Sequence, residues 1–313
     1  MKQYIYMIIV FSFCISAQAQ EMVFTPQWKA QSQFAGFYIS DSLGYYKEEG
    51  VNLRIKHLPI TQGPLLAIKD EMCQIITSNL LHVIHFNSTN KDPNKDLVNI
   101  MQLSQNNSYM LISRYPLKGV NSLKNKTIAV WSYIDDTLLE AVNATTGFNI
   151  KWIKFNGGVN ILLSKAVDII LVAKANEYHL IEESGWTIKP NHIIKFADTY
   201  NIPEEGVYVT HEYYNKNKEA LDKFVKASKR GWEWAAANRK ETVDIVMQFA
   251  FKYNLGTNRY HQRMMLDDIL HLNIDRDSNK RTYKLSEDGY NCAIDFISIK
   301  DTNNLMKYSE FVK

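Results

Sequence analysis

Histidine and cysteine are the residues that would mark a metal site or a nucleophile, and the chain contains eight histidines and three cysteines. The sequence has no H-E-x-x-H motif, no cysteine pair at zinc spacing and no acidic calcium loop. His82 and His85 lie three residues apart on an expected helix, but no third ligand stands near them in the sequence. We therefore interpret both as core or surface histidines and expect no metal site.

Motifs for nucleotide binding and covalent catalysis are also missing. The glycine pair Gly157-Gly158 follows Asn156 without a G-x-G-x-x-G pattern or a P-loop lysine, and is typical of a turn before a helix. No G-x-S-x-G elbow is present, and neither Cys73 nor Cys292 stands in a nucleophile signature. Both cysteines lie in apolar contexts that favour a buried thiol, and a disulfide between them stays open. Covalent catalysis therefore has no visible nucleophile.

Aromatic side chains, in contrast, recur at the expected strand ends and loop tips, where rings can sandwich a flat ligand. They are Trp28, Phe37, Tyr38, Trp131, Tyr178 and Tyr208. Aromatic residues make up 12% of the chain, so ordinary packing is the alternative for any single ring. We expect the set as a whole to include the wall of a binding site.

One acidic residue has a comparable position. Glu177 comes shortly after the apolar run Val167–Ala173, where a side chain at the carboxyl end of a strand would face a cleft. A carboxylate there can accept a hydrogen bond from an amino group or a ring N–H, worth about 1.5 to 3 kcal/mol when charged. Capping of the helix that follows is the alternative, because acids favour helix starts.

Helix and strand signals alternate along the chain, which predicts an α/β fold with largely parallel sheets. A connector at residues 114–125 contains the proline and glycine expected of a boundary, and an acidic loop with Pro203 and Gly206 leads back into a strand. We expect two lobes joined by two crossings, with a ligand cleft between them. The first lobe would comprise residues 20–114 and 207–313, and the second residues 115–206.

The first 19 residues have the pattern of a cleaved secretory signal, with Lys2, an apolar core at Tyr4–Ile15 and small residues before Ala19. The core is shorter than the ~20 residues of a membrane-spanning helix, so we expect a soluble, exported, periplasmic protein. Cys14 leaves lipid attachment open, although Phe13 fits such a signal poorly. Without Lys2, 35 of the 36 basic residues face 33 acidic ones, and a net charge of +2 argues against nucleic acid as a partner.

Four blocks of the sequence resemble one family, in the order in which that family has them. The blocks are TPQWKAQSQFAGFYISDSLGYYKEEGVNLRI, SLKNKTIAVW, AVDIILVAKANEYHLIEESGW and PEEGVYVTHEYYNKNKEALDKFVKASKRGWEWAAAN. They are similar to the THI5/NMT1-like group of ABC-transporter solute receptors, which bind pyrimidine precursors, sulfonates and other small solutes. The resemblance spans nearly all of the mature chain. It implies the type II periplasmic-binding-protein fold, a Venus flytrap whose two lobes close on a small ligand.

By position, the resemblance also implies which side chains line the cleft: Trp28, Phe37, Tyr38, Trp131, Glu177 and Tyr208. Two departures from the family pattern matter. Residues 132–136 stand where close relatives have a glycine-rich tract, so a phosphate-like contact through backbone N–H groups is not expected. Ser78 stands where the pyrimidine synthases of the group have the lysine that binds pyridoxal phosphate, so we expect no cofactor and no enzymatic activity.

These expectations describe a monomeric receptor that binds a planar amino-heterocycle, such as a thiamine pyrimidine precursor, and delivers it to an ABC permease. Three alternatives remain open at this point. The same fold can report ligand occupancy to a membrane kinase or cyclase, or it can bind another solute such as a sulfonate, nitrate or riboflavin. A pyrimidine synthase is the least favoured.

Overall fold

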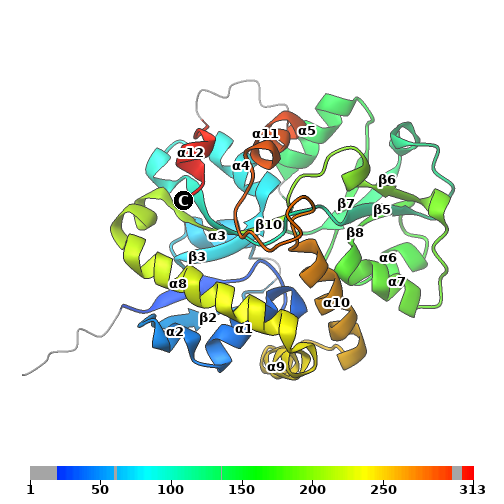
Figure 1. The fold of residues 1–313 in the computed structure, drawn as a ribbon. Helices are drawn as coiled ribbons and strands as arrows, with labels where there is room; N and C mark the ends of the chain where they lie inside the picture. Colours follow the sequence, from blue (N-terminus) through cyan, green and yellow to red (C-terminus); the bar gives the residue numbers. More distant parts are fainter. Residues whose placement is uncertain (1–19, 60–61, 135, 298–304) are drawn as a thin grey trace, which may run out of the picture.

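The computed structural model describes residues 20–59, 62–134, 136–297 and 305–313, so the expected signal peptide and Cys14 lie outside the described residues. The strands form two five-stranded sheets. Each sheet lies in its own lobe, with helices packed against its faces (Figure 1). The prediction of an α/β fold with two sheets is confirmed.

The first sheet brings together strands from both ends of the chain. It contains β1 (Met22–Thr25), β2 (Leu53–Ile55), β3 (Ile75–Asn79), β4 (Leu97–Gln102) and β10 (Glu205–Thr210). Its strand order is β2-β1-β3-β10-β4, in which β1 runs parallel to β2 and β3, whereas β10 is antiparallel to both of its neighbours. All five residues of β3 are buried, as expected for a strand covered on both faces.

The helices of the first lobe come from the N-terminal region and from the last third of the chain. They are α1 (Ala35–Ser42), α2 (Tyr45–Glu48), α3 (Pro64–Lys69), α4 (Leu80–Thr89), α8 (His211–Ala237), α9 (Arg239–Lys252), α10 (Arg259–Leu272), α11 (Glu287–Ile297) and α12 (Tyr308–Phe311). The helices α1 and α8 cross closely at two glycines. A Cβ at Gly231 would collide with the carbonyl oxygen of Gly36, and a Cβ at Gly36 would collide with the ring of Trp232.

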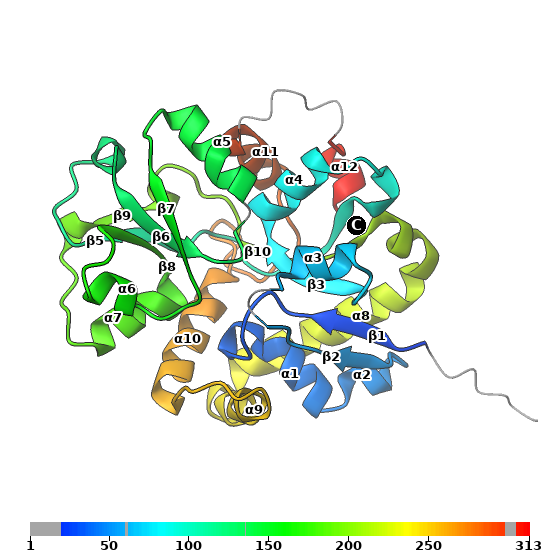
Figure 2. The same ribbon diagram turned by 180° about the vertical axis from the view of Figure 1, so that it is seen from behind.

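The second sheet forms the other lobe (Figure 2). Its strands are β5 (Tyr109–Ser113), β6 (Thr127–Trp131), β7 (Lys151–Phe155), β8 (Ile169–Ala173) and β9 (Ile193–Lys195), in the order β7-β6-β8-β5-β9. Its helices are α5 (Asp136–Thr146), α6 (Asn160–Leu163) and α7 (His179–Glu183). A π-helical turn, Lys174–Tyr178, joins β8 to α7 and becomes important for the cavity between the lobes.

The first crossing between the lobes lies earlier than expected. The strand β5 pairs antiparallel with β8 and β9 of the second sheet, so the chain leaves the first sheet after Gln102 and enters the second at Tyr109. The expectation that the first lobe extends to residue 114 is therefore wrong, because β5 belongs to the second lobe. The proline and glycine at Pro116 and Gly119 mark a turn inside the second lobe, after β5.

Within the described residues, no helix is both long and apolar enough to cross a membrane. The described part of the chain also contains no cluster of three or more histidine, cysteine or acidic side chains that could hold a metal ion. Cys73 is buried and Cys292 partly exposed, and both are free thiols. Burial raises the pKa of Cys73 to about 11, so that its thiol stays protonated and unreactive at neutral pH.

Candidate functional site

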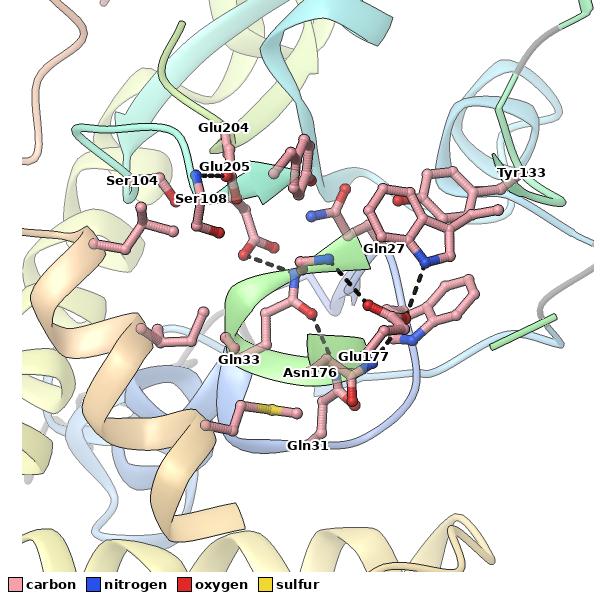
Figure 3. Close-up of a pocket in the computed structure, with 18 residues that line it drawn as sticks. Gln27, Gln31, Gln33, Ser104, Ser108, Tyr133, Asn176, Glu177, Glu204 and Glu205 are labelled. Carbon is pink, nitrogen blue, oxygen red and sulfur yellow. Dashed lines mark hydrogen bonds between the residues drawn. The ribbon is translucent and has the colours of Figure 1, made fainter. Parts of the chain in front are cut away.

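A cavity lies between the lobes, where both crossings pass, with about 520 Å³ of empty space that is partly open to solvent. The first lobe contributes the segment around Gln27–Gln33 and the start of β10, and the second lobe contributes the ends of β6 and β8. The helix α10 closes one side with three apolar residues, Met265, Ile269 and Leu272. Figure 3 shows the lining side chains converging on this space.

Three rings from strand ends and loops form an aromatic wall. Trp131 is the last residue of β6, and its ring lies parallel to that of Tyr133, with 6.0 Å between centroids and 13° between planes. Tyr109, the first residue of β5, lies 5.1 Å from the Trp131 ring on another side. Trp28 of the first lobe approaches Tyr133 at 5.2 Å, so the aromatic contact crosses between the lobes.

Glu177 lies in the π-helical turn after β8 and is buried, with 1% of its surface exposed. Its Oε1 accepts hydrogen bonds from Trp131 Nε1 at 2.9 Å and from Asn176 Nδ2 at 3.0 Å, and its Oε2 accepts one from the backbone N–H of Ala173 at 3.2 Å. Burial raises the pKa of Glu177, and these hydrogen bonds to the carboxylate oppose that rise. The Glu177 carboxylate therefore fixes the orientation of the Trp131 indole.

Two further carboxyl groups lie where β10 begins, at Glu204 and Glu205, and both are buried. Glu204 accepts a hydrogen bond from the backbone N–H of Ser108, and burial raises its pKa to about 7. Glu205 Oε2 accepts a hydrogen bond from Gln33 Nε2 at 3.1 Å (Figure 3). Burial raises the pKa of Glu205 to about 8, so this side chain is mostly uncharged at neutral pH.

The other oxygen of Glu205, Oε1, is buried and makes no hydrogen bond of good geometry among the described residues, although the side chains of Thr77 and Gln27 lie near the carboxyl group and lower its pKa. A buried polar atom without a partner costs about 1 to 3 kcal/mol, and in native proteins such atoms mark places where water or a ligand binds. None of the lining residues is lysine, arginine or histidine. The cavity therefore offers acceptors to a ligand that brings its own N–H or O–H donors, and it offers no cation to an anionic ligand.

Three of the six predicted site residues line the cavity, namely Trp28, Trp131 and Glu177. Phe37 and Tyr38 do not line it and are fully buried inside the first lobe. Phe37 packs parallel to Phe224 of α8 at 6.3 Å, and Tyr38 stacks on Phe249 of α9 at 4.1 Å. Both rings point away from the cleft because they lie on the faces of α1 that α8 and α9 cover.

Tyr208 is also fully buried and lies 6.1 Å from Phe311 of α12, away from the cavity. Gly36, which precedes Phe37 in α1, allows the close contact of α1 with Trp232. The expectation that Phe37, Tyr38 and Tyr208 form the cleft wall therefore does not hold in this structure. Tyr109 and Tyr133 occupy the wall in their place.

The sequence analysis missed the acidic pair and the amide side chains that surround it. Gln27, Gln31 and Gln33 line the cavity from the first lobe, and Gln31 Nε2 donates to Gln33 Oε1 at 2.9 Å. A signal for the acidic pair was present. Glu204 and Glu205 stand directly before the apolar run 206–209. Two adjacent acids at the start of a buried strand are costly to bury, so their presence there indicates a functional role.

Comparisons with known proteins agree with this architecture. The family model described as NMT1/THI5 like matches residues 31–242. Among curated proteins, the riboflavin-binding protein RibY of Chloroflexus aurantiacus is 23% identical over 267 residues, which cover 80% of this chain and 72% of that protein.

Solved structures show the same fold at low sequence identity. A Candida albicans protein, described as having the generic periplasmic-binding-protein fold, superposes with a TM-score of 0.67 at 12% identity and covers 94% of this chain and 96% of its own. The aliphatic sulphonate-binding protein SsuA of Escherichia coli gives a TM-score of 0.62 at 11% identity, over 94% and 92% of the two chains. The expected periplasmic-binding-protein fold is confirmed.

Proposed function

Since the chain belongs to the NMT1/THI5-like family of solute-binding proteins, we propose that it is the exported receptor of an ABC importer. Its ligand is a small planar heterocycle that bears an amino group, of the kind that serves as a pyrimidine precursor of thiamine. The ligand binds between the lobes, and closure of the lobes shields it from water. The closed receptor then delivers it to a membrane permease.

The observation that supports this ligand class is the unpaired Oε1 of Glu205 beside an aromatic wall. An exocyclic amino group can donate to that oxygen and to Glu204 nearby, while the ring stacks on Trp131 or Tyr133. Each stacked pair contributes about 0.5 to 1.5 kcal/mol beyond area burial. A hydrogen bond from the ligand to the uncharged carboxyl group adds about 0.5 to 1.5 kcal/mol.

Riboflavin is the second candidate ligand, because the relative from Chloroflexus aurantiacus is named for binding it. Its ring system is also flat and has an N–H donor, so the aromatic wall suits it as well. Sulfonate and nitrate fit less well, since three buried carboxyl groups line the cavity and no basic residue does. Delivery of the ligand signal to a membrane kinase or cyclase would use the same closure and remains the alternative to a permease.

The lining of the cavity contains neither lysine nor cysteine, which supports a receptor in place of a synthase. Ser78, which stands at the position of the synthase lysine, is a buried residue of β3 and has no amino group to form a Schiff base with pyridoxal phosphate.

Mass spectrometry of the small molecules released from the natively purified protein tests the ligand class. We expect an amino-substituted aromatic heterocycle, present in stoichiometric amount and lost from a Trp131→Ala variant. A flavin would support the second candidate. A sulfonate or another anion without a donor group would contradict the assignment made from Glu205.

A further inference from the structure

The helix α10 joins the two lobes beside the cavity. On the side of the first lobe, the backbone N–H of Ser32 donates to Gln262 Oε1 at 2.7 Å, and Ser32 Oγ donates to the carbonyl oxygen of Gln262 at 2.7 Å. Ser32 belongs to the same segment as Gln31 and Gln33, which line the cavity. These buried hydrogen bonds hold α10 to the first lobe.

The opposite side of α10 contacts the second lobe at two places. At the first, Asp268 accepts from Lys174 Nζ at 2.7 Å and lies 2.6 Å from His179 Nε2. At the second, His261 lies between two oxygens, with Nδ1 3.0 Å from Glu183 Oε1 and Nε2 3.1 Å from Asn176 Oδ1. Both contacts join the lobes, but only the second continues into the cavity.

A chain of hydrogen bonds leads from His261 to the aromatic wall. Asn176 Nδ2 donates to Glu177 Oε1, which also accepts from Trp131 Nε1. Because the indole N–H can only donate, Glu177 Oε1 acts as the acceptor, and the amide nitrogen of Asn176 must face it. The amide oxygen of Asn176 therefore faces His261, whose Nε2 must donate (Figure 3 shows the Asn176–Glu177 part of this chain).

The chain has one member on the first lobe and three on the second. His261 is 4% exposed and Glu177 1% exposed, so water does not readily replace either partner. Because His261 stands on α10 and its partner Asn176 on the second lobe, a separation of the two would leave the Asn176 amide without this donor.

We propose that His261 is a positioning residue, which fixes the ligand-stacking ring of Trp131 through Asn176 and Glu177 from across the boundary between the lobes. This inference rests on the proposed function in that it takes Trp131 to stack on the ligand. Closure of the lobes and stacking of the ligand then stabilise each other. Closure fixes the Trp131 ring on which the ligand stacks, and the stacked ligand holds the Trp131 side of the chain of hydrogen bonds in place. Lys174 and Asp268 join the same surfaces without contributing to the chain.

The indole N–H of Trp131 provides a test that needs no ligand. Its resonance in the ¹H–¹⁵N spectrum is identified among the six tryptophans by its loss in Trp131→Phe, and its exchange with solvent deuterium is measured in the ligand-free protein. His261→Ala should raise the exchange rate on the order of tenfold, which corresponds to about 1.4 kcal/mol of lost hydrogen bonding. His261→Gln, which keeps one donor, should restore most of the protection.

Lys174→Ala is the matched control, since it removes an interlobe contact from the same turn with no link to Trp131. We expect less than a twofold change in exchange for this variant. An unchanged rate in His261→Ala, or an equal rise in Lys174→Ala, overturns the proposal. If His261→Ala loses cooperative thermal unfolding, His261→Leu replaces it, because leucine fills the buried position and removes the donor, and a rate in that variant equal to wild type overturns the proposal in the same way.

A titration with the hydroxymethyl aminopyrimidine precursor of thiamine then separates this proposal from the proposed function. Weaker binding to His261→Ala than to Lys174→Ala supports the positioning role, and equal binding to both contradicts it. If wild type binds no aminopyrimidine, the ligand assignment fails, while the exchange measurement still decides the role of His261.

Discussion

Replacing Glu205 with glutamine should stabilise the ligand-free protein at alkaline pH. The buried carboxyl group has a pKa of about 8, against an ordinary value of 4.5 for the exposed side chain of an unfolded chain. Between these two values the folded protein binds a proton that the unfolded chain has released. The stability of the folded state therefore falls as the pH rises through this range.

The size of the effect follows from the same two values. Each pH unit between 4.5 and about 8 lowers the free energy of unfolding by about 1.4 kcal/mol, which amounts to roughly 5 kcal/mol near pH 9. Glutamine is nearly isosteric and never charged, so Glu205→Gln removes this loss. We expect the variant to match wild type within about 1 kcal/mol near pH 5 and to exceed it by several kcal/mol near pH 9.

Urea unfolding of both proteins across this pH range is the appropriate assay, since its midpoint and slope together give the free energy of unfolding. Glu241→Gln is a suitable control, because Glu241 is an exposed acid in the first turn of α9. Its pH profile should run parallel to that of wild type. A parallel profile for Glu205→Gln would refute the assignment of a buried, uncharged carboxyl group.

Three further substitutions separate the site from the core that surrounds it. Trp131→Phe keeps a ring but removes the donor to the buried Glu177, so affinity for the aminopyrimidine measured by calorimetry should fall about tenfold, and the free energy of unfolding should fall by about 1 to 3 kcal/mol. Tyr38→Phe removes a hydroxyl that lies 2.7 Å from His57 Nε2. It should lower the free energy of unfolding by about 1 kcal/mol and leave ligand affinity unchanged. A loss of affinity would mean that Tyr38 contacts the ligand after all. Gly231→Ala places a Cβ against the carbonyl oxygen of Gly36. In urea unfolding, it should lower the free energy of unfolding by about 3 kcal/mol or more. An unchanged midpoint of urea unfolding would mean that α1 and α8 can move apart at no cost in stability.

Much of the fold follows from local sequence patterns. The run Val167–Ala173 becomes the buried strand β8 (Ile169–Ala173), and Thr127–Trp131 is β6, as the sequence predicts. Trp131 and Glu177 reach the cavity because residues at or just after the carboxyl ends of strands face the space between lobes. These features depend on periodicity and strand ends, which are visible in one sequence.

The first crossing could not be located in this way. The segment 103–108 contains neither proline nor glycine, and its hydrogen bonds come from distant parts of the chain. Gln105 donates its backbone N–H to Leu272 at 3.0 Å, and Asn106 Nδ2 donates to the carbonyl oxygen of Ile274 at 2.8 Å. Because these partners lie more than 160 residues later, the boundary is set by tertiary structure.

Which aromatic residues lie in the core and which line the cavity also depends on tertiary contacts. Phe37 and Tyr38 are adjacent on α1, and both are turned into the core by α8 and α9, which follow more than 170 residues later. The role of Glu205 depends on burial, which the composition of its own segment does not reveal. A sequence pattern shows that rings and acids are present, whereas packing decides which of them face the ligand.

Calorimetric titration of the aminopyrimidine precursor into protein that has been unfolded, freed of bound molecules and refolded is the most direct test of the ligand assignment. The account predicts saturable one-to-one binding to wild type and affinity at least about tenfold weaker in Glu205→Leu, which removes both acceptor oxygens. Equal affinity for both proteins, or binding of an alkanesulfonate in preference to the aminopyrimidine, would contradict it.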